Sequence, residues 1–279
     1  MSIQHADHDP KRDEVLVYEK VGKTAVITLN RPRYKNALDE SLLAAMPAAI
    51  RAARQDASVA SVVLTGAGGS FCSGAQLAAG AGEVEKPFAV RDVLLDANRW
   101  FSELADLEKP VISAVDGFAV GAGFSLALAA DFVIASERAT FGAVFARMGL
   151  VPDLSLLHVL PRLVGLARAK EIAFSARDIP AEEALQMGLV QAVVPPERLR
   201  EAALAFARRF DDAPTHVLGL AKNILNRSFE TDRYGLAQWE AAVQGLLAGS
   251  SYHAKALERF VSREAPAYPG APRFDAARP

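Results

Sequence analysis

One cysteine, Cys72, is all that the 279-residue sequence contains, so the chain cannot form an internal disulfide bond. A chain without disulfides is typical of a reducing compartment, and we expect the protein to be cytoplasmic. No histidine or aspartate lies near Cys72 in the sequence to activate it as a nucleophile. The pattern therefore favours a small packed thiol at this position.

The sequence also lacks a long apolar run, an excess of either charge and a metal-binding motif. Asp116 and Asp131 bracket its most hydrophobic stretch, which falls short of the ~18 residues of a membrane span. The first residues are polar and acidic, unlike a secretory or transit segment. The net charge of −2 gives no basic field for a nucleic acid or a membrane surface. His5, Asp7, His8 and Asp9 have a spacing that could suggest a metal site, but they are interpreted as part of a solvated tail. No other Cys, His or carboxylate cluster has metal-ligand spacing, so we expect no metal.

The distribution of apolar residues predicts an α/β chain with a helical C-terminal part. We expect a flexible tail at 1–13, an α/β core at 14–196, a helical region at 197–265 and an extended tail at 266–279. Strands are predicted at 15–20, 23–29, 61–65, 111–115, 132–135, 140–142 and 190–194. Helices are predicted after Asp39 and at 92–107, 124–130, 197–210, 215–228, 233–248 and 252–263. Residues 78–90 are predicted to form a surface loop, and Pro47 should kink or restart the first helix.

The chain is organised around the stretch from Val111 to Asp131, which is predicted to be a strand, a glycine turn and a buried helix. The strand is followed by a turn at Asp116-Gly117, and Gly121-Ala-Gly123 then leads into the helix. The first N–H groups of a helix have no partner within it, and neighbouring glycines let an oxygen atom approach them. This pattern indicates a site for a negative oxygen, either permanent or formed in a transition state. The alternative is that the glycines only let the helix pack tightly on a sheet.

A second stretch repeats this arrangement. The predicted strand at 61–65 is followed by the run Gly66-Ala-Gly-Gly-Ser-Phe-Cys-Ser-Gly-Ala-Gln-Leu77. Two such turns can each donate one backbone N–H to the same oxygen atom, which is the geometry of an oxyanion hole.

The motifs of this chain resemble those of the crotonase (enoyl-CoA hydratase/isomerase) superfamily. Phe71-Cys-Ser-Gly-Ala-Gln-Leu77 and Gly117-Phe-Ala-Val-Gly-Ala-Gly123 are similar to the paired oxyanion motifs of that family. The other matching motifs are Leu29-Asn-Arg-Pro32, Lys35-Asn-Ala-Leu38, Gly149-Leu-Val-Pro-Asp153 and Leu160-Pro-Arg-Leu-Val-Gly165. They occur in the order typical of the family, and the last two resemble isomerase-type members that act on enoyl-CoA or ring-1,2-epoxyphenylacetyl-CoA.

The resemblance implies a fold, a substrate and a set of site residues. The core would be a spiral of ββα units that holds the acyl-CoA site, followed by a helical trimerisation region, in a homotrimer or a dimer of trimers. The substrate would be an acyl-CoA thioester, with coenzyme A as part of the substrate and no separate cofactor. The N–H groups of Ala75 and Ala122 would hold the thioester oxygen. Contacts to the substrate are implied for Arg33, Lys35, Ala37, Gln76, Leu77, Gly121, Ser125, Phe145, Phe260 and Arg263.

Several of these assignments have a plain structural alternative. The basic loop with Arg33 and Lys35 would contact the phosphates of the coenzyme A nucleotide, or it is an ordinary solvated loop. Phe260 and Arg263 would also contact the nucleotide, or they are a packed ring and a solvated charge. The helix at 92–107 would line the acyl pocket, or its apolar residues are simply core. Those residues are Leu94, Leu95, Trp100, Phe101 and Leu104.

The side chains around the predicted hole decide which reaction it serves. Family hydratases use two glutamates to activate water, and the resemblance places Ser125 and Phe145 at those positions. Neither can act as the base, so water addition is poorly supported. Asp153 is the remaining acid in the matched motifs, and it would either move a proton or cap a helix that begins at Leu154. His158, at helical spacing among leucines, is interpreted as a packed histidine.

We therefore expect an enzyme that stabilises an enolate and isomerises the double bond of an enoyl-CoA, with Asp153 as acid and base. One alternative is an enoyl-CoA hydratase with an atypical base. Another is a non-catalytic crotonase homologue that only binds acyl-CoA. The family usually has small residues after the aspartate, whereas this chain has Leu154 and Leu156, whose bulk would narrow or close the site.

Overall fold

The computed structural model of the chain describes residues 14–76, 89–271 and 274. Its strands are β1 (Leu16–Val21), β2 (Thr24–Leu29), β3 (Ser61–Gly66), β4 (Val111–Val115), β5 (Phe118–Val120), β6 (Phe132–Ser136), β7 (Thr140–Gly142), β8 (Ile179–Pro180) and β9 (Ala192–Val194). Its α-helices are α1 (Glu40–Gln55), α2 (Ala89–Ala105), α3 (Ala122–Leu128), α4 (Leu156–Val164), α5 (Leu166–Ser175), α6 (Ala181–Gln186), α7 (Leu199–Arg208), α8 (Thr215–Leu225), α9 (Arg233–Ala248) and α10 (Ser251–Val261). Short 3-10 helices lie at Pro32–Tyr34, Val144–Met148 and Pro196–Arg198.

The main sheet has six strands in the order β1-β2-β3-β4-β6-β9. β1 and β2 form the predicted antiparallel hairpin, and the other neighbouring strands of this sheet are parallel. Parallel neighbours need long crossover connections, which the intervening helices provide. The strand β4 is buried at every residue, as expected for a parallel strand covered on both faces.

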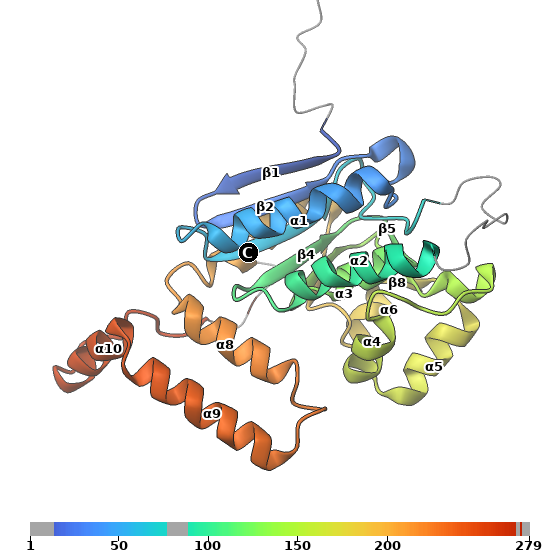
Figure 1. Cartoon of the computed structure of the whole chain (residues 1–279). Helices are drawn as coiled ribbons and strands as arrows, with labels where there is room; N and C mark the ends of the chain where they lie inside the picture. Colours follow the sequence, from blue (N-terminus) through green and yellow to red (C-terminus); the bar gives the residue numbers. More distant parts are fainter. Residues whose placement is uncertain (1–13, 77–88, 272–273, 275–279) are drawn as a thin grey trace, which may run out of the picture.

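Alternate residues of the strands face two separate hydrophobic clusters. Ile27 and Leu64 belong to the larger cluster, together with buried side chains of α1, α2 and α3. Val26 and Val63, their neighbours in the strands, belong to the smaller cluster with Phe206 of α7. This period of two places α1, α2 and α3 on one face of the sheet, which is the near face in Figure 1. The residues of α7 pack on the other face.

A second sheet, in the order β5-β7-β8, makes the arrangement a spiral. After β4 the chain forms β5 and α3, and after β6 it forms β7 before it reaches α4. β5 pairs in parallel with β7, and β4 with β6, so each turn of the chain adds one strand to each sheet. Cys72 extends the small sheet through a bridge to Ala119, in the preceding turn between β3 and α2. The predicted spiral of ββα units is confirmed.

The helix α1 is one uninterrupted element. Asp39 caps it as predicted, because its side chain accepts a hydrogen bond from the Leu42 N–H at 3.0 Å. Pro47 lies inside the helix, which continues past it, so the prediction of a restart is wrong. Met46 and Ile50 are buried on either side of the proline, and their burial holds both halves of the helix against the sheet.

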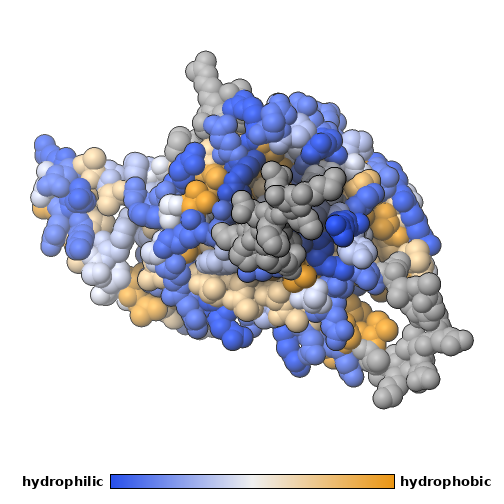
Figure 2. Space-filling model, turned by 90° about the horizontal axis from the view of Figure 1, so that it is seen from above, coloured by the Kyte–Doolittle hydropathy of each residue, from blue (hydrophilic) through white to orange (hydrophobic). Residues whose placement is uncertain are grey.

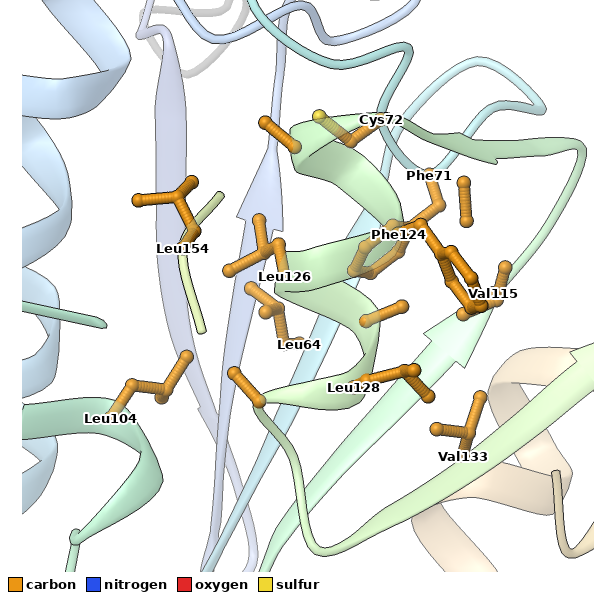
Figure 3. Close-up of a cluster of buried hydrophobic side chains, with 14 of the residues drawn as sticks. Leu64, Phe71, Cys72, Leu104, Val115, Phe124, Leu126, Leu128, Val133 and Leu154 are labelled. Carbon is orange, nitrogen blue, oxygen red and sulfur yellow. The ribbon is translucent and has the colours of Figure 1, made fainter. Parts of the chain in front are cut away.

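The helix α3 is buried at each of its seven residues. It begins at Ala122, two residues before the start predicted from the sequence. In Figure 3 its side chains Phe124 and Leu126 lie among those of other elements, including Leu64 of β3 and Leu104 of α2. The surrounding elements therefore fix both α3 and the turn that precedes it.

The other predicted elements within the described residues are present, with shifts at their ends, whereas β5, β8, α4, α5 and α6 had no predicted bounds. The helix α9 has the predicted bounds, and α7, α8 and α10 end a few residues before their predicted ends. The strand predicted at 190–194 is reduced to its last three residues, β9. The predicted tail at 1–13 and most of the predicted loop at 78–90 lie outside the described residues. None of the helices that the structure describes is long and apolar enough to cross a membrane.

The helices α8, α9 and α10 extend to one side of the layered core (Figure 1). The helix α8 lies close to the core at Gly219, where a Cβ atom would stand 2.4 Å from the Cβ of Glu108. Neither α9 nor α10 has a buried residue. In Figure 2 this projecting part carries hydrophobic as well as hydrophilic residues on its surface. The exposed large apolar side chains of α9 and α10 are Tyr234, Leu246, Tyr252, Leu257, Phe260 and Val261.

Candidate functional site

Two glycine turns meet at the start of α3. Cys72, in the first turn, donates its N–H to the Phe118 carbonyl oxygen at 2.8 Å and accepts from the Val120 N–H at 3.1 Å. Gly123 lies so close that a Cβ there would be 2.2 Å from the Cys72 carbonyl oxygen, so only glycine fits. The two turns that the sequence predicts to share one oxygen atom are therefore side by side.

Ala75 and Ala122 carry the two N–H groups at this junction, which we call the donor pair. Neither N–H has a hydrogen-bond acceptor in the described part of the chain. Gly74 has a φ of +96°, and a Cβ there would lie 3.5 Å from the Ala122 nitrogen, so the first turn passes directly beside the second. Gly121, with a φ of +56°, gives the second turn a backbone conformation that favours glycine. Two such donors can stabilise an oxygen that gains negative charge.

Asp153 is held beside α3 through its main chain. Ser125 of α3, which is 2% exposed, donates its hydroxyl to the Asp153 carbonyl oxygen at 3.0 Å. The next residue, Leu154, is buried in the hydrophobic cluster around α3 (Figure 3). Leu154 and Ser155 have φ values of 46° and 62°, which are uncommon away from glycine. The buried contacts hold this strained segment and fix Asp153 next to the helix that carries Ala122.

The carboxyl group of Asp153 is half-buried. Its Oδ1 atom is buried and has no hydrogen-bond partner among the described residues. Burial disfavours the charged form and raises the pKa of Asp153 to about 6, against the opposing effect of a hydrogen bond from its own backbone N–H. A carboxyl group with such a pKa can accept a proton and return it near neutral pH.

The alternative interpretation of Asp153 as a helix cap is wrong. The helix α4 begins at Leu156 instead of Leu154, and no side chain caps its first turn. Only the carbonyl oxygen of Asp153 takes part, by accepting from the Leu156 N–H at 3.0 Å. The carboxyl group is left available for chemistry.

Cys72 and His158, two other residues with chemically reactive side chains, differ in burial. Cys72 is confirmed as a packed thiol, because it is fully buried and burial raises its pKa to about 12. His158 is exposed, so its interpretation as a packed histidine is wrong. Its Nδ1 atom lies 3.6 Å from the Glu230 carboxylate, and the buried side of α4 is formed instead by Leu156 and Leu160.

The two positions that the family resemblance assigns to the hydratase glutamates carry no acid. The Ser125 hydroxyl is used in the bond to the Asp153 carbonyl oxygen. Phe145 is buried in the 3-10 helix that precedes α4. That segment adjoins the donor pair, because a Cβ at Gly121 would lie 3.7 Å from a methyl group of Val144. A buried phenyl ring at this place cannot activate a water molecule.

The basic loop before α1 reaches the same junction. Arg33 and Lys35 are exposed, and the Lys35 Nζ atom lies 4.3 Å from the centre of the Phe118 ring, next to the second glycine turn. Gln76 is exposed beside Ala75, whereas Ala37 is buried and offers no side-chain surface to a substrate. Leu77 lies outside the described residues.

The two C-terminal residues of the predicted site stand apart from it within one chain. Phe260 is 80% exposed near the end of α10, and Arg263 follows that helix. Figure 1 shows α10 at the far end of the projecting helices, away from α3. Within one chain, α10 therefore does not bring either residue to the donor pair.

A cavity of about 690 Å³ lies at the opposite end of α3 from the donor pair. Phe101 of α2, Leu128 of α3, Val159 of α4 and Leu218 of α8 are among its walls. Of the predicted acyl-pocket residues, Phe101 borders this cavity, Trp100 and Leu104 are buried core, Leu94 is half-buried and Leu95 is exposed. No group of three or more His, Cys, Asp or Glu side chains in the described ranges is placed to hold a metal ion.

The model of the enoyl-CoA hydratase/isomerase family matches residues 19–271 of the chain. The chain belongs to this family. It has the crotonase fold of this enzyme family. The enzymes of the family act on acyl-CoA thioesters. The glycine turns, the donor pair and Asp153 all lie within the matched region.

Similar proteins include both hydratases and an isomerase. A short-chain-enoyl-CoA hydratase of Clostridium acetobutylicum is 35% identical over 251 residues, which are 89% of this chain and 95% of that protein. A 1,2-epoxyphenylacetyl-CoA isomerase of Escherichia coli is 33% identical over 248 residues, which are 88% of this chain and 94% of that protein. The crystal structure of an enoyl-CoA hydratase/isomerase from Cupriavidus metallidurans superimposes with a TM-score of 0.85 at 37% identity, covering 94% of this chain and 98% of the other.

Asn36 and Arg31 are residues of this region that the sequence analysis did not assign. Both lie in the first family motifs, at Leu29-Asn-Arg-Pro32 and Lys35-Asn-Ala-Leu38. Asn36 is fully buried with a φ of 55°, and Arg31 bonds to the chain just after the first glycine turn. One feature of the sequence could have indicated the role of Asn36: it is an asparagine in a predicted loop, and asparagine tolerates the left-handed conformation.

Proposed function

We propose that this chain isomerises the double bond of an enoyl-CoA thioester, with the donor pair holding the thioester oxygen and Asp153 moving the proton. The observation that carries the proposal is the junction of Ala75, Ala122 and Asp153. Two free N–H groups lie on adjoining turns, and a half-buried carboxyl group with a raised pKa is tied to the same helix.

The proposed reaction is a balanced proton transfer. In its ionised form Asp153 takes a proton from the α-carbon of a 3-enoyl-CoA, and the electrons of the broken C–H bond form a dienolate. The negative charge rests on the thioester oxygen, where the N–H groups of Ala75 and Ala122 stabilise it. Asp153 then returns the proton to the γ-carbon, the double bond moves next to the thioester, and the carbonyl re-forms. No electron is gained or lost, so we propose that the reaction uses no cofactor.

Hydration of an enoyl-CoA is the second candidate, because several similar proteins are named hydratases. Ser125 and Phe145 argue against it. Water addition needs a base that orients and deprotonates a water molecule, and neither a hydrogen-bonded hydroxyl nor a phenyl ring does this. A third candidate, a protein that binds acyl-CoA without turning it over, leaves the raised pKa of Asp153 without a use.

For the remainder of the substrate, we propose that the exposed Arg33 and Lys35 meet the phosphates of coenzyme A and that Gln76 lies at the entrance. We further propose that the chain assembles as a homotrimer or a dimer of trimers, with 197–265 as its oligomerisation region. In that assembly Phe260 and Arg263 would contact the nucleotide bound to a neighbouring copy. The absence of buried residues in α9 and α10 supports this. The single, buried thiol supports a cytoplasmic location.

The experiment that tests the proposal compares two substitutions at one donor. Ala75→Pro removes the free N–H, whereas Ala75→Ser keeps it and changes only the exposed side chain. With a 3-enoyl-CoA we expect Ala75→Pro to lower kcat by about 10²–10³-fold and Ala75→Ser to stay near the wild type. With crotonyl-CoA we expect hydration far below the ~10 s⁻¹ of a typical enzyme.

Three results would contradict the proposal. If calorimetry detects no binding of acyl-CoA thioesters at millimolar concentration, the chain has no acyl-CoA site. Equal activity of the two Ala75 variants would show that the Ala75 N–H does not stabilise the thioester oxygen. Rapid hydration of crotonyl-CoA without isomerisation would select the hydratase.

A further inference from the structure

Asn36 is a polar side chain that is fully buried beside the first glycine turn. Its amide nitrogen donates to the carbonyl oxygens of Ala67 at 2.9 Å and of Ser70 at 2.6 Å. Its amide oxygen accepts from the Arg31 N–H at 2.8 Å. Three hydrogen bonds to main-chain atoms satisfy a buried amide well, and they connect the basic loop to the loop that follows β3.

The segment that carries the Ala75 N–H lies beyond the end of β3 and outside the main sheet. It pairs with the residues just after Asn36. The Leu38 N–H donates to the Gly74 carbonyl oxygen at 2.8 Å, and the Gln76 N–H donates to the Leu38 carbonyl oxygen at 2.9 Å. These two bonds flank Ala75 and direct its own N–H away from Leu38. The direction of the donor is therefore set by the segment 35–38.

Arg31 holds this segment from its other side. Its guanidinium group donates to the Ala37 carbonyl oxygen at 2.7 Å and to the Gln76 side chain at 2.8 Å, and it pairs with Asp39 at 2.8 Å. The side chain is only 11% exposed. A planar group with several fixed donors is well suited to hold main-chain and side-chain oxygens at the same time.

The start of the loop has little room for movement. A Cβ atom at Gly66 would lie 2.2 Å from the Ser70 carbonyl oxygen and 2.7 Å from the Asn36 amide nitrogen. The Asn36 amide thus sits in a close-packed turn and ties both Ala67 and Ser70 to the segment that positions Ala75.

We propose that Asn36 is a positioning residue for the Ala75 half of the donor pair, with Arg31 as its support. The inference rests on the proposed function, since it assigns these residues to the alignment of one oxyanion donor. Asn36 touches neither the substrate nor the reacting atoms. Its amide fixes the loop at Ala67 and Ser70 to the segment 35–38. Leu38 of that segment bonds to the residues on both sides of Ala75, so that the Ala75 N–H meets the thioester oxygen without reorganisation.

The test uses two variants and one control in the full-length protein. Asn36→Asp keeps the size and the tolerance of a positive φ, but it replaces the two amide donors by an oxygen. Arg31→Lys keeps the charge and loses the planar fork. Ser61→Ala is the control, because it removes a buried hydrogen bond to Thr24 at the opposite end of β3.

Three quantities are measured for each protein: kcat with a 3-enoyl-CoA, affinity for a saturated acyl-CoA, and the infrared carbonyl band of that ligand labelled with ¹³C at the thioester carbon. A hydrogen bond to the carbonyl oxygen moves this band to lower wavenumber, so the band reports on the donor directly. For Asn36→Asp we expect kcat to fall about 10- to 100-fold, because a misplaced catalytic group costs up to ~10²-fold. Affinity should stay within a few-fold, and the band should lose part of its shift. Ser61→Ala should keep the shift and the kcat of the wild type.

The outcomes separate the inference from the function on which it rests. A wild-type protein that binds the thioester without a band shift would overturn the proposed donor pair itself. A normal wild-type shift that Asn36→Asp retains, with kcat like that of Ser61→Ala, would overturn the role of Asn36 alone. If Asn36→Asp does not fold, Arg31→Lys is judged by the same band and the same comparison.

Discussion

At the scale of single residues, Asp153 links the stability of the fold to its chemistry. Its carboxyl group is held in a segment where Leu154 is buried and Ser125 binds the main chain, so it cannot move freely to water. The raised pKa of Asp153 means that the folded protein pays to ionise this group. A base that is costly to ionise is also one that readily accepts a proton from carbon near neutral pH.

The raised pKa of Asp153 makes the free energy of unfolding depend on pH in a definite direction. The pKa of Asp153 is about 6 in the folded state and ~3.9 for an ordinary aspartate, so between these values the folded protein binds more protons than the unfolded chain. The free energy of unfolding therefore falls as pH rises from about 4 to about 6, as far as this group is concerned. Above pH 6 the full penalty is present.

We predict that Asp153→Asn stabilises the protein at about pH 7.5 and has little effect at about pH 4. The gain should be about 1–2 kcal/mol, less than the ~3 kcal/mol of a two-unit shift in a dry site, because water still reaches part of the carboxyl group. Denaturant unfolding at both pH values measures it. Asp212→Asn, at an exposed position, controls for the loss of one negative charge. Destabilisation of Asp153→Asn at pH 7.5 would mean that the native structure favours the carboxylate.

The sequence was informative about these residues to different degrees. The two glycine turns could be predicted because their strands and small residues leave few alternatives, and Asp153 could be found because it is the acid in a matched motif. The sequence could not show that the Asp153 side chain does not cap α4. That result depends on the positive φ of Leu154, which is rare for a leucine and which no local pattern predicts. The role of Asn36 also escaped, because it depends on carbonyl groups about 30 residues away in the chain.

At the scale of elements, the periodic segments were predictable and their contacts were not. Strands of the main sheet and the helix α9 follow from hydrophobic alternation and helical spacing. Pro47 was expected to kink or restart α1, but the helix continues past it, because burial of the residues on either side outweighs the lost hydrogen bond. His158 was placed on the wrong side of α4 because spacing alone does not fix which face of a helix is buried.

The attachment of α8 to the core depends on an ion pair that joins residues 91 positions apart. Lys222 of α8 donates to the Asp131 carboxylate at 2.8 Å, and the same carboxylate oxygen accepts from the Val111 N–H at 2.7 Å. Lys222 and Asp131 could not be paired from the sequence, since no local pattern connects them. Asp131 lies just after α3, so the pair ties α8 to the end of that helix and to the start of β4.

We predict that Lys222→Met destabilises the protein by about 3 kcal/mol, because it leaves Asp131 without its cation in a largely buried place. Combining it with Asp131→Asn should recover most of the loss, since the amide oxygen can still accept from Val111. A double-mutant cycle by denaturant unfolding measures the coupling. Strictly additive effects of the two substitutions would show that the pair does not act as a unit.

At the scale of the whole molecule, the layered core and the projecting helices have different characters. The spiral buries a continuous apolar cluster on each face of the main sheet. The helices α9 and α10 bury no residue within the chain and carry exposed apolar side chains. Isolated helices of this length are marginally stable in water. The proposed assembly would supply the contacts that α9 and α10 lack within one chain.

We predict that Leu246→Glu with Phe260→Glu reduces the assembly to smaller species, because two charges would enter an apolar interface. Light scattering coupled to size-exclusion chromatography gives the mass of each variant. Phe174→Glu on α5, where the ring is 77% exposed on the core, serves as the matched control. A wild-type protein that runs as a monomer, or a double variant that remains trimeric, would contradict the proposed interface.

The most direct test of the account is the exchange of α-protons of a bound acyl-CoA into deuterated water. We predict that the wild-type protein catalyses this exchange, because the donor pair stabilises the enolate and Asp153 removes the proton. Asp153→Asn should lose about 10²–10⁴-fold of this rate while thioester affinity stays within a few-fold. Exchange that survives Asp153→Asn unchanged would assign the base to another residue. Binding of acyl-CoA without any exchange in the wild type would contradict enolate chemistry at this site altogether.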